Sequence, residues 1–290
     1  MIEISAFAKI NLFLDIQGKR ADGYHDIISV MQSVDWCDKL RIEKNTQEKI
    51  ILVCSTPDIP TDERNTVYKA AKLFLDKAGL REGVSITLDK HIPHEAGMAG
   101  GSADAAATLK GMNRLFGAPF SVEELLSMGK SIGADVPFCL VGGTRLVEGI
   151  GEKISDFPIA PPCYILCAKE GEGVSTPVAY RTLDTKYGNF EHYQPRWDLL
   201  KKLSDSFSEG KHEKSLFNIF ENVVESERPH VTHLKKTMYE HGALVAMMSG
   251  SGPSVFGVFD DLSLAQKAES VLKKSGTVCR VCKPLCALDE

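Results

Sequence analysis

Three glycines within five residues, placed between a strand-like segment and a run of small residues, constrain this 290-residue chain most strongly. The stretch reads Ile92-Pro93-His94-Glu95-Ala96-Gly97-Met98-Ala99-Gly100-Gly101-Ser102-Ala103-Asp104-Ala105-Ala106-Ala107. Glycines let a backbone turn tightly and approach a ligand closely. A helix that begins at Ser102 would point free N–H groups and its positive dipole end into the loop, where they attract phosphate. The pattern predicts either a phosphate-binding loop or a tight turn with close helix packing.

The two commonest nucleotide-binding motifs are missing from this stretch. It contains no G-x-x-x-x-G-K-[ST], so a loop that carries its own lysine is not expected. It also lacks the G-x-G-x-x-G that follows the first strand of a dinucleotide-binding fold, which argues against a dinucleotide-dependent oxidoreductase. If the loop binds phosphate, it is of a third type.

Charge and hydropathy exclude several classes of partner. Lysine and arginine total 34 against 39 acidic residues, a net charge of -5, whereas nucleic-acid binding requires a concentrated basic surface. No segment approaches the ~20 apolar residues of a membrane span. The first residues carry neither a signal peptide nor a transit segment. We therefore expect a cytoplasmic protein whose partners are small molecules, with no nucleic acid and no membrane.

The eight cysteines are scattered, and Cys279 and Cys282 form a C-x-x-C pair with Cys286 four residues later. A redox or zinc role is open, but no second pair completes a metal site. Reduced thiols without a part in the chemistry are the expectation for a cytosolic chain.

The N-terminal segment alternates as a half-buried strand does, with apolar residues at every second position from Ile2 to Ile16. The other set includes Lys9 and Asn11, which should project from one face roughly 7 Å apart. A lysine in such a strand either extends from an edge or is placed for chemistry. Gly18 ends the strand, and a turn containing Asp22-Gly23 follows.

The rest of the chain predicts an α+β protein, because strands and helices are interspersed without regular β-α-β alternation. The three prolines of 157–162 disfavour both helix and strand, so we predict domains at 1–157 and 158–290. In the first domain we expect strands at 27–34, 39–44, 49–54 and 84–90, a helix over 67–78 capped by Asn65 or Thr66, one from Ser102, and one from Ser121 with a Ser121/Glu124 capping box. In the second we expect a strand at 163–168, loop to about 196, helices at 197–207, 214–226 and 229–241, strands at 243–249 and 254–260, a helix at 261–275 and a strand at 277–283.

Four further features invite a functional interpretation beside a structural one. A second glycine-rich stretch, 248–257, is either a hairpin turn or a second backbone wall of the same cleft. Asp135, expected between the end of a helix and the start of a strand, either satisfies backbone N–H groups or does chemistry. His25 is expected in a loop, and Asp104 is interpreted as a first-turn carboxylate stabilised by the helix dipole.

Taken together, these segments resemble the GHMP kinase superfamily. The resemblance rests on Ala8-Lys9-Ile10-Asn11-Leu12-Phe13-Leu14, on the run from Gly18 to His25, on 93–107, on Gly133-Ala134-Asp135-Val136-Pro137-Phe138 and on Ser249-Gly250-Ser251-Gly252-Pro253-Ser254. It covers about residues 5 to 259. It implies a two-domain α+β GHMP kinase fold: an N-terminal ribosomal-protein-S5-like domain, a C-terminal ferredoxin-like domain, and an active site in the cleft between them.

The resemblance also implies a reaction, in which ATP with Mg²⁺ phosphorylates the 2-hydroxyl of 4-diphosphocytidyl-2-C-methyl-D-erythritol in the non-mevalonate route to isopentenyl diphosphate. Asp135 would accept the hydroxyl proton, and Lys9 beside it would keep that carboxylate ionised. The residues implied to wrap the ATP phosphates are Pro93, His94, Glu95, Ala96, Gly97, Met98, Ala99, Gly100, Gly101, Ser102 and Ala103. Those implied to bind the cytidyl diphosphate end are Asn11, Tyr24, His25 and Tyr180. Which side chain, if any, contacts Mg²⁺ stays open.

The sequence departs from the family's Gly-Leu-Gly-Gly-Gly-Ser-Ser loop at two positions. Ala99 adds a Cβ, which is tolerable if its φ is negative, and Ala103 lacks a hydroxyl. Two other functions stay open: a GHMP kinase acting on homoserine, mevalonate or a sugar, and a non-catalytic relative that binds nucleotide and regulates a partner. The Asp22-Gly23-Tyr24-His25 run argues against the first, and the presence of both Lys9 and Asp135 argues against the second.

Overall fold

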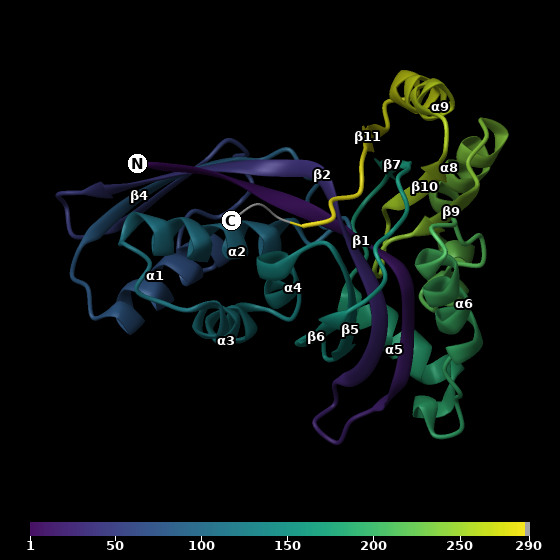
Figure 1. Cartoon of the computed structure of the whole chain (residues 1–290), viewed down its shortest axis with the longest axis horizontal. Coiled ribbons are helices and arrows are strands. Elements are labelled where there is room, and N and C mark those ends of the chain that lie inside the picture. The colour runs from purple at the N-terminus through teal and green to yellow at the C-terminus, as the bar shows by residue number, and fades with distance from the viewer. Residues whose placement is uncertain (288–290) are drawn as a thin grey trace. The chain divides into compact units, whose positions relative to one another are not determined.

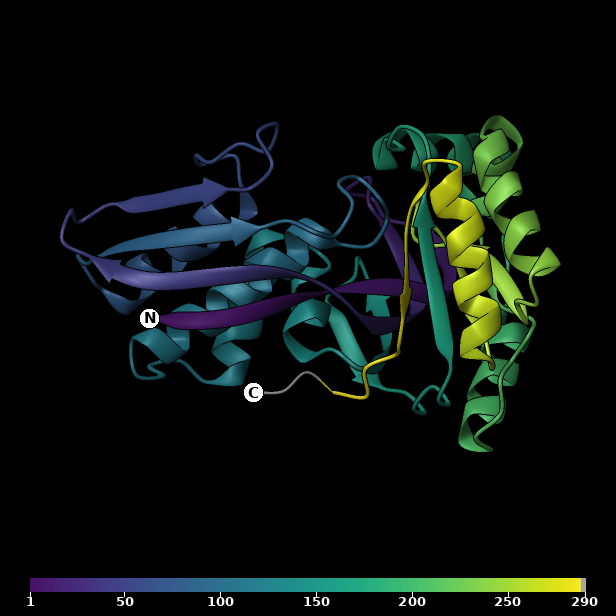
Figure 2. The same ribbon diagram turned by 90° about the horizontal axis from the view of Figure 1, so that it is seen from above.

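The computed structural model describes residues 1–287, which form two compact units interleaved along the chain (Figures 1 and 2). Unit 1 comprises residues 1–8, 36–94 and 99–141, and unit 2 comprises 9–35, 95–98 and the chain from 142 onward. The interleaving arises because two long strands, β1 (Ile2–Lys19) and β2 (His25–Asn45), contribute residues to both units. The sequence analysis predicted two continuous domains that meet at residue 157, whereas each of these units is made of several segments of the chain. The predicted domain boundary stays a prediction.

Unit 1 is a sheet covered by helices on one face. The strands lie in the order β3-β4-β2-β1, with β3 parallel to β4 and β4 antiparallel to β2. Figure 1 shows α1, α2 and α3 gathered on one side of these strands. The remaining elements of this unit are β3 (Ile50–Cys54), α1 (Thr66–Ala78), β4 (Gly83–Asp89), α2 (Gly100–Leu115), α3 (Val122–Ile132) and α4 (Val136–Val141).

The helix boundaries in unit 1 follow local chemistry, as the sequence predicted. The Asn65 side chain accepts a hydrogen bond from the Val67 N–H, and Gly79 ends the helix with a left-handed φ of 63°. Ser121 and Glu124 form the predicted capping box of α3. Helix α2 begins two residues before the predicted Ser102.

Unit 2 contains a four-stranded antiparallel sheet in the order β11-β7-β10-β9. Along the chain its pattern is strand, helices, strand, strand, helix, strand, which is the ferredoxin-like arrangement implied by the resemblance. Figure 2 shows α8 and α9 side by side along this sheet. The strands and main helices are β7 (Tyr164–Lys169), α5 (Thr176–Lys186), α6 (Trp197–Ser208), α8 (Pro229–Glu240), β9 (Val245–Met248), β10 (Val255–Phe259), α9 (Leu262–Lys274) and β11 (Val278–Cys282).

One apolar core joins the sheet and helices of unit 2 to the ends of β1 and β2. It includes Leu14 of β1, Leu166 of β7, Phe220, Phe259 and Leu272, each nearly inaccessible to solvent. Completing this unit are the hairpin of β5 (Thr144–Gly149) and β6 (Lys153–Asp156), the two-residue strand β8 (Phe217–Asn218), helix α7 (Glu221–Val224), and the 3-10 helices η1 (Gly188–Phe190) and η2 (Glu225–Glu227). The α+β class predicted from the sequence is confirmed.

Several predicted elements differ from the structure. The strands expected at 27–34 and 39–44 are one strand, because Asp38 is fully buried within it and accepts hydrogen bonds from the Ile92 N–H and Lys90. The segment expected as loop to residue 196 contains α5, which buries Ala179 and Leu183 although most of its surface is polar. The helix expected at 214–226 is instead β8, α7 and η2, because Phe217 and Asn218 pair in parallel with β1.

Within the described residues, no helix is long and apolar enough to cross a membrane.

Candidate active site

Strand β1 places Lys9 and Asn11 on one face, as the alternation predicted, but the expectation of a half-buried strand was wrong. Every residue from Ala8 to Ile16 is buried, because both faces of this part of the strand are covered. Lys9 and Asn11 are 4% and 1% exposed, and the Lys9 Nζ donates to Asn11 Oδ1 at 2.8 Å. Asn11 Nδ2 donates in turn to the Ser29 Oγ on β2 at 2.9 Å, and that hydroxyl donates to the Phe13 carbonyl. A buried ammonium is costly unless it is hydrogen-bonded, so this chain of donors fixes the place of the Lys9 side chain.

His25 is the first residue of β2 rather than a loop residue, and it is buried. Its Nε2 lies 2.7 Å from Asp184 Oδ1, and the Lys19 Nζ donates to the other carboxylate oxygen, also at 2.7 Å. The His25 ring stacks on Tyr180 with centroids 4.7 Å apart, and Phe190 meets it edge-on at 5.7 Å. Tyr180 lies on helix α5, where the sequence indicated a loop.

The charge on Asp184 is favoured by its two partners. Partial burial by itself would raise its pKa, but hydrogen bonds from Lys19 and His25 outweigh burial and lower the pKa below the usual value. An ionised Asp184 accepts a hydrogen bond from the Nε2–H of His25. The other ring nitrogen, Nδ1, then faces away from the carboxylate. Tyr24, next to His25, is 63% exposed in the turn.

The two glycine-rich stretches touch each other in unit 2. The Ser249 Oγ donates to the Gly97 carbonyl at 3.0 Å, and a Cβ added to Gly97 would come within 2.2 Å of the Ser249 carbonyl oxygen. Gly97 also has a φ of 71°, a conformation that side chains disfavour. The stretch at 248–257 is a hairpin turn between β9 and β10, as its structural interpretation expected, and its backbone packs directly against the first loop.

Ala99 has a left-handed φ of 56°, which contradicts the expectation of a negative φ. It is the N-cap of α2, and no side chain caps this helix. Its carbonyl still accepts the first intrahelical hydrogen bond, from the Ala103 N–H at 2.9 Å. The sharp turn needed to enter α2 from the loop forces this conformation, at a cost of roughly 1–2 kcal/mol for a residue with a Cβ. The first N–H groups of the helix are thus left without a side-chain acceptor at the N-cap.

Asp104 lies in the second turn of α2, not in its first turn, and its carboxylate is buried in unit 1. The Lys90 Nζ donates to Asp104 Oδ2 at 2.7 Å and pairs also with the buried Asp38. Burial raises the pKa of Asp104 to about 7; Lys90 opposes this shift and Asp38 adds to it. The dipole interpretation was therefore wrong, and this network ties residues on both sides of the glycine loop to β2.

Asp135 is half-buried and directly precedes α4, where the sequence predicted a strand. Its carbonyl accepts from the Cys139 N–H at 3.1 Å. Pro137 is compatible with the first turn of a helix because its missing N–H has no intrahelical acceptor there. The helix ends at Gly142 and Gly143, both with left-handed φ.

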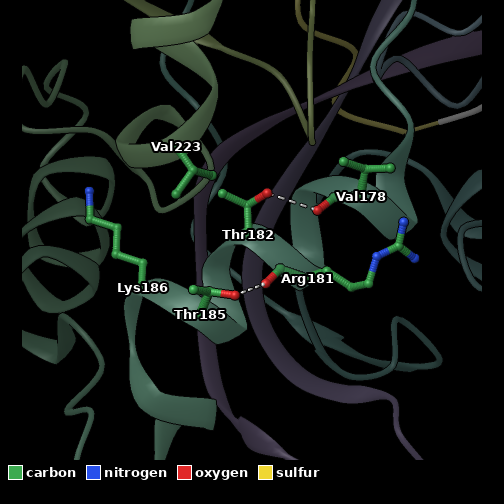
Figure 3. A pocket seen from close by; sticks show the side chains of 6 residues that line it. All are labelled: Val178, Arg181, Thr182, Thr185, Lys186 and Val223. Atoms are coloured by element: carbon green, nitrogen blue, oxygen red, sulfur yellow. Dashed lines mark hydrogen bonds between the residues drawn. The ribbon is translucent and has the colours of Figure 1, made fainter.

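Helix α5 also lines a surface hollow of about 380 Å³ on unit 2, shown in Figure 3. Its walls are Val178, Arg181, Thr182, Thr185 and Lys186 of α5, with Val223 of α7. Both threonine hydroxyls donate back to carbonyls of their own helix, and Lys186 donates to the Asn222 carbonyl. None of the residues indicated by the sequence analysis lines it, so we do not include it in the candidate site.

The sequence analysis missed four residues that hold the candidate groups in place. Asp184 fixes His25, Lys90 and Asp38 brace the glycine loop, and Asn218 braces the second glycine turn. They lie far from their partners in sequence, and no local pattern marks them. A buried position for Asn218 or Asp38 becomes evident only when the strands pair.

None of the eight cysteines, all of which lie within the described residues, forms a disulfide. Burial raises the pKa of the Cys163 thiol to about 12 and that of Cys279 to about 11. Residues 1–287 also contain no group of three or more His, Cys, Asp or Glu side chains that could hold a metal ion.

Comparison with known proteins identifies the class. The sequence profile described as GHMP kinases N terminal domain matches residues 65–143, and the one described as GHMP kinases C terminal matches residues 191–278. The chain belongs to the GHMP kinase family, and it is accordingly a kinase.

Individual relatives are similar along almost the whole chain. The 4-diphosphocytidyl-2-C-methyl-D-erythritol kinase of Caldicellulosiruptor saccharolyticus is 45% identical over 270 residues, 93% of this chain and 92% of that protein. The protein of the same name from Clostridium beijerinckii is 44% identical over 273 residues, 94% of this chain and 96% of that one. A crystal structure of a 4-(cytidine 5'-diphospho)-2C-methyl-D-erythritol kinase superposes with a TM-score of 0.82 at 28% identity, covering 98% of this chain and 99% of that one.

The left-handed Ala99 predicts that Ala99→Gly stabilises the protein. Glycine removes the conformational strain at φ 56°, so the free energy of unfolding should rise by about 1 kcal/mol in urea titration. The matched control is Ala107→Gly in the interior of the same helix, which should lower it by about 1 kcal/mol. An equal loss in both variants would show that Ala99 is not strained.

The raised pKa of Asp104 predicts a pH dependence of stability. Between pH 3.8, the ordinary pKa of an aspartate, and about pH 7, the folded state keeps a proton that the unfolded state loses, so this group makes stability fall as pH rises. Asp104→Asn, which cannot ionise, should show a flatter decline of Tm from pH 5 to pH 8 than the unmutated chain. Asp76→Asn, at an exposed position on α1, should keep the original slope. If the plots of Tm against pH are parallel for all three proteins, the pH dependence does not come from a raised pKa of Asp104.

Proposed function

We propose that this kinase transfers the γ-phosphoryl group of ATP to the 2-hydroxyl of 4-diphosphocytidyl-2-C-methyl-D-erythritol, giving the 2-phosphate and ADP. The observation that carries the proposal is the similarity to kinases of that name, 45% and 44% identical over nearly the whole chain. The Lys9-Ile10-Asn11 strand and the Asp22-Gly23-Tyr24-His25 turn support the same substrate within the family. The proposed reaction belongs to the non-mevalonate route to isopentenyl diphosphate.

The segment from Pro93 to Ala103 would wrap the ATP phosphates. Its uncapped helix start at Ala99 and the close backbone packing at Gly97 support this assignment, because an anion can accept from the first N–H groups of α2. Mg²⁺, when bound with ATP, would offset phosphate charge. We assign it no protein ligand, since a metal carried by the nucleotide needs few of them.

In the proposed mechanism Asp135 accepts the proton of the 2-hydroxyl as the oxygen attacks the γ-phosphorus. Lys9 would act with it, because a cation near a carboxylate favours the ionised form that a base requires. The hydrogen bond from Lys9 to Asn11 supports an ammonium held in one orientation. Phosphoryl transfer depends mainly on alignment and charge stabilisation, so this small set of groups is chemically sufficient.

His25, Tyr180, Tyr24 and Asn11 would bind the cytidyl diphosphate end of the substrate. With Asp184 accepting from Nε2–H, Nδ1 is the His25 ring nitrogen left to contact the cytosine base. The stacked ring of Tyr180 offers an aromatic face for a base. A carboxylate that fixes the tautomer of His25 would thus contribute to the choice of base.

The first test of the proposal is ADP release with Mg·ATP and 4-diphosphocytidyl-2-C-methyl-D-erythritol, measured beside mevalonate and homoserine. We expect turnover with the cytidyl substrate alone. Turnover with mevalonate or homoserine instead would assign a different acceptor to the same fold. Tight ATP binding without turnover of any acceptor would favour a non-catalytic regulator.

The role of Asp135 predicts that Asp135→Asn lowers kcat by ~10²–10⁴, the usual contribution of a positioned base. The Kd for ATP should change little, because the base contacts the acceptor rather than the nucleotide. The matched control is Asp156→Asn: this carboxylate is 98% exposed and pairs with Arg145 at the surface, so kcat should be unaffected. Activity of Asp135→Asn within threefold of the unmutated enzyme would exclude Asp135 as the base.

A further inference from the structure

Asn218 lies in unit 2, where its side chain contacts both the second glycine-rich turn and the backbone of Phe220. It lies in β8, which pairs in parallel with β1 so that Leu14 faces Asn218 and the Ile219 N–H donates to the Leu14 carbonyl at 2.9 Å. The residue is 2% exposed. Its backbone is therefore fixed to the same strand that carries Lys9.

The Asn218 amide holds the second glycine turn. Its Nδ2 donates to the Met248 carbonyl at 2.7 Å and to the Gly250 carbonyl at 2.8 Å. Its Oδ1 accepts from the Phe220 N–H at 3.0 Å. Both amide hydrogens and the carbonyl oxygen are thus used, and only an amide supplies this combination of donors and acceptor in so small a side chain.

The turn held by Asn218 in turn holds the first glycine loop. The Ser249 Oγ, between the two carbonyls bound by Asn218, donates to the Gly97 carbonyl at 3.0 Å. The next residue of that loop returns to β1, because the Lys9 N–H donates to the Met98 carbonyl at 3.1 Å. The hydrogen bonds form a closed ring, from β1 through Asn218 and Ser249 to Gly97 and Met98, and back to β1.

We propose that Asn218 is a positioning residue, which closes this ring and thereby sets Gly97 and Met98 of the phosphate loop against the strand that carries Lys9. The inference rests on the proposed function of the loop and of Lys9. A misplacement of about 1 Å can cost a hundredfold in rate when reaction depends on alignment, so a residue that contacts no substrate can still control turnover.

The test is Asn218→Asp, which keeps the shape but removes both N–H donors and sets anionic oxygen against the carbonyls of Met248 and Gly250. We expect kcat/KM for ATP to fall about 10- to 100-fold. Amide hydrogen exchange in a peptide covering residues 94–99 should become faster, and this readout is independent of turnover.

The matched control is Asn113→Asp, the same substitution in another side chain that braces a loop backbone. Asn113 Nδ2 donates to the Phe120 carbonyl and its Oδ1 accepts from the Phe120 N–H, away from both glycine segments. A general loss of stability would affect both variants. Only Asn218→Asp should change kcat/KM for ATP and exchange at residues 94–99.

A second variant, Ser249→Ala, removes the next link of the ring and carries the test if Asn218→Asp does not fold. Ser249→Ala by itself should also speed amide hydrogen exchange at residues 94–99. In the double variant, the loss in kcat/KM for ATP should be smaller than the product of the two single losses, because both substitutions act through the same ring of hydrogen bonds. Multiplicative losses, or unchanged exchange at 94–99 in both single variants, would overturn the role of Asn218. A last outcome separates the two proposals. If exchange changes as expected but the unmutated chain gives no ADP release with any of the acceptors tested, the positioning role holds and the proposed function fails.

Discussion

The interior of unit 2 depends on one constraint: strand β1 buries polar side chains, and each of them must find a hydrogen-bond partner. Lys9 and Asn11 are joined to each other and to Ser29. Asp15, which is fully inaccessible, accepts from the Tyr193 hydroxyl at 2.7 Å and from the backbone of Arg196 at 2.8 Å. Because an unpaired buried charge costs several kcal/mol, these partners determine where the segment from 184 to 196 can lie.

The same requirement explains why the two glycine-rich stretches meet. Gly97 has no room for a Cβ against the Ser249 carbonyl, and the carbonyl of Gly97 takes the Ser249 hydroxyl as its donor. Close backbone approach brings polar groups together without side chains to separate them. The loop is therefore held against the turn at Gly97, three residues before α2 begins. A loop held in place in this way suits a reaction whose rate depends on alignment.

Buried and half-buried carboxylates recur as structural supports rather than as chemical groups. Asp38 accepts from the Ile92 N–H and pairs with Lys90, Asp184 fixes His25, and Glu221 accepts from the Met248 N–H while Lys235 offsets its charge. Burial raises the pKa of Glu221, and Lys235 opposes this shift. The candidate chemical groups Lys9, His25 and Asp135 are few. Asp184 holds His25 in place, and Asp38 and Asp104 hold Lys90 beside the glycine loop.

The sequence by itself determined the features that depend on neighbours along the chain. The strand at β1, the caps at Asn65 and Ser121, the glycine loop before α2 and the α+β class all follow from local patterns, and the structure agrees with them. The burial of both faces of β1 does not follow from its alternation. The motifs from Lys9 to Ser254 were enough to indicate the family. What only the tertiary structure decided is where distant segments meet. Helix α5 looked like a loop because few of its residues are apolar, and it forms because Ala179 and Leu183 fit a core built from other segments. The left-handed Ala99, the ion pair of Asp104 with Lys90 and the double hydrogen bond of Asn218 have no local signature, since each results from the close packing of residues that the sequence keeps apart.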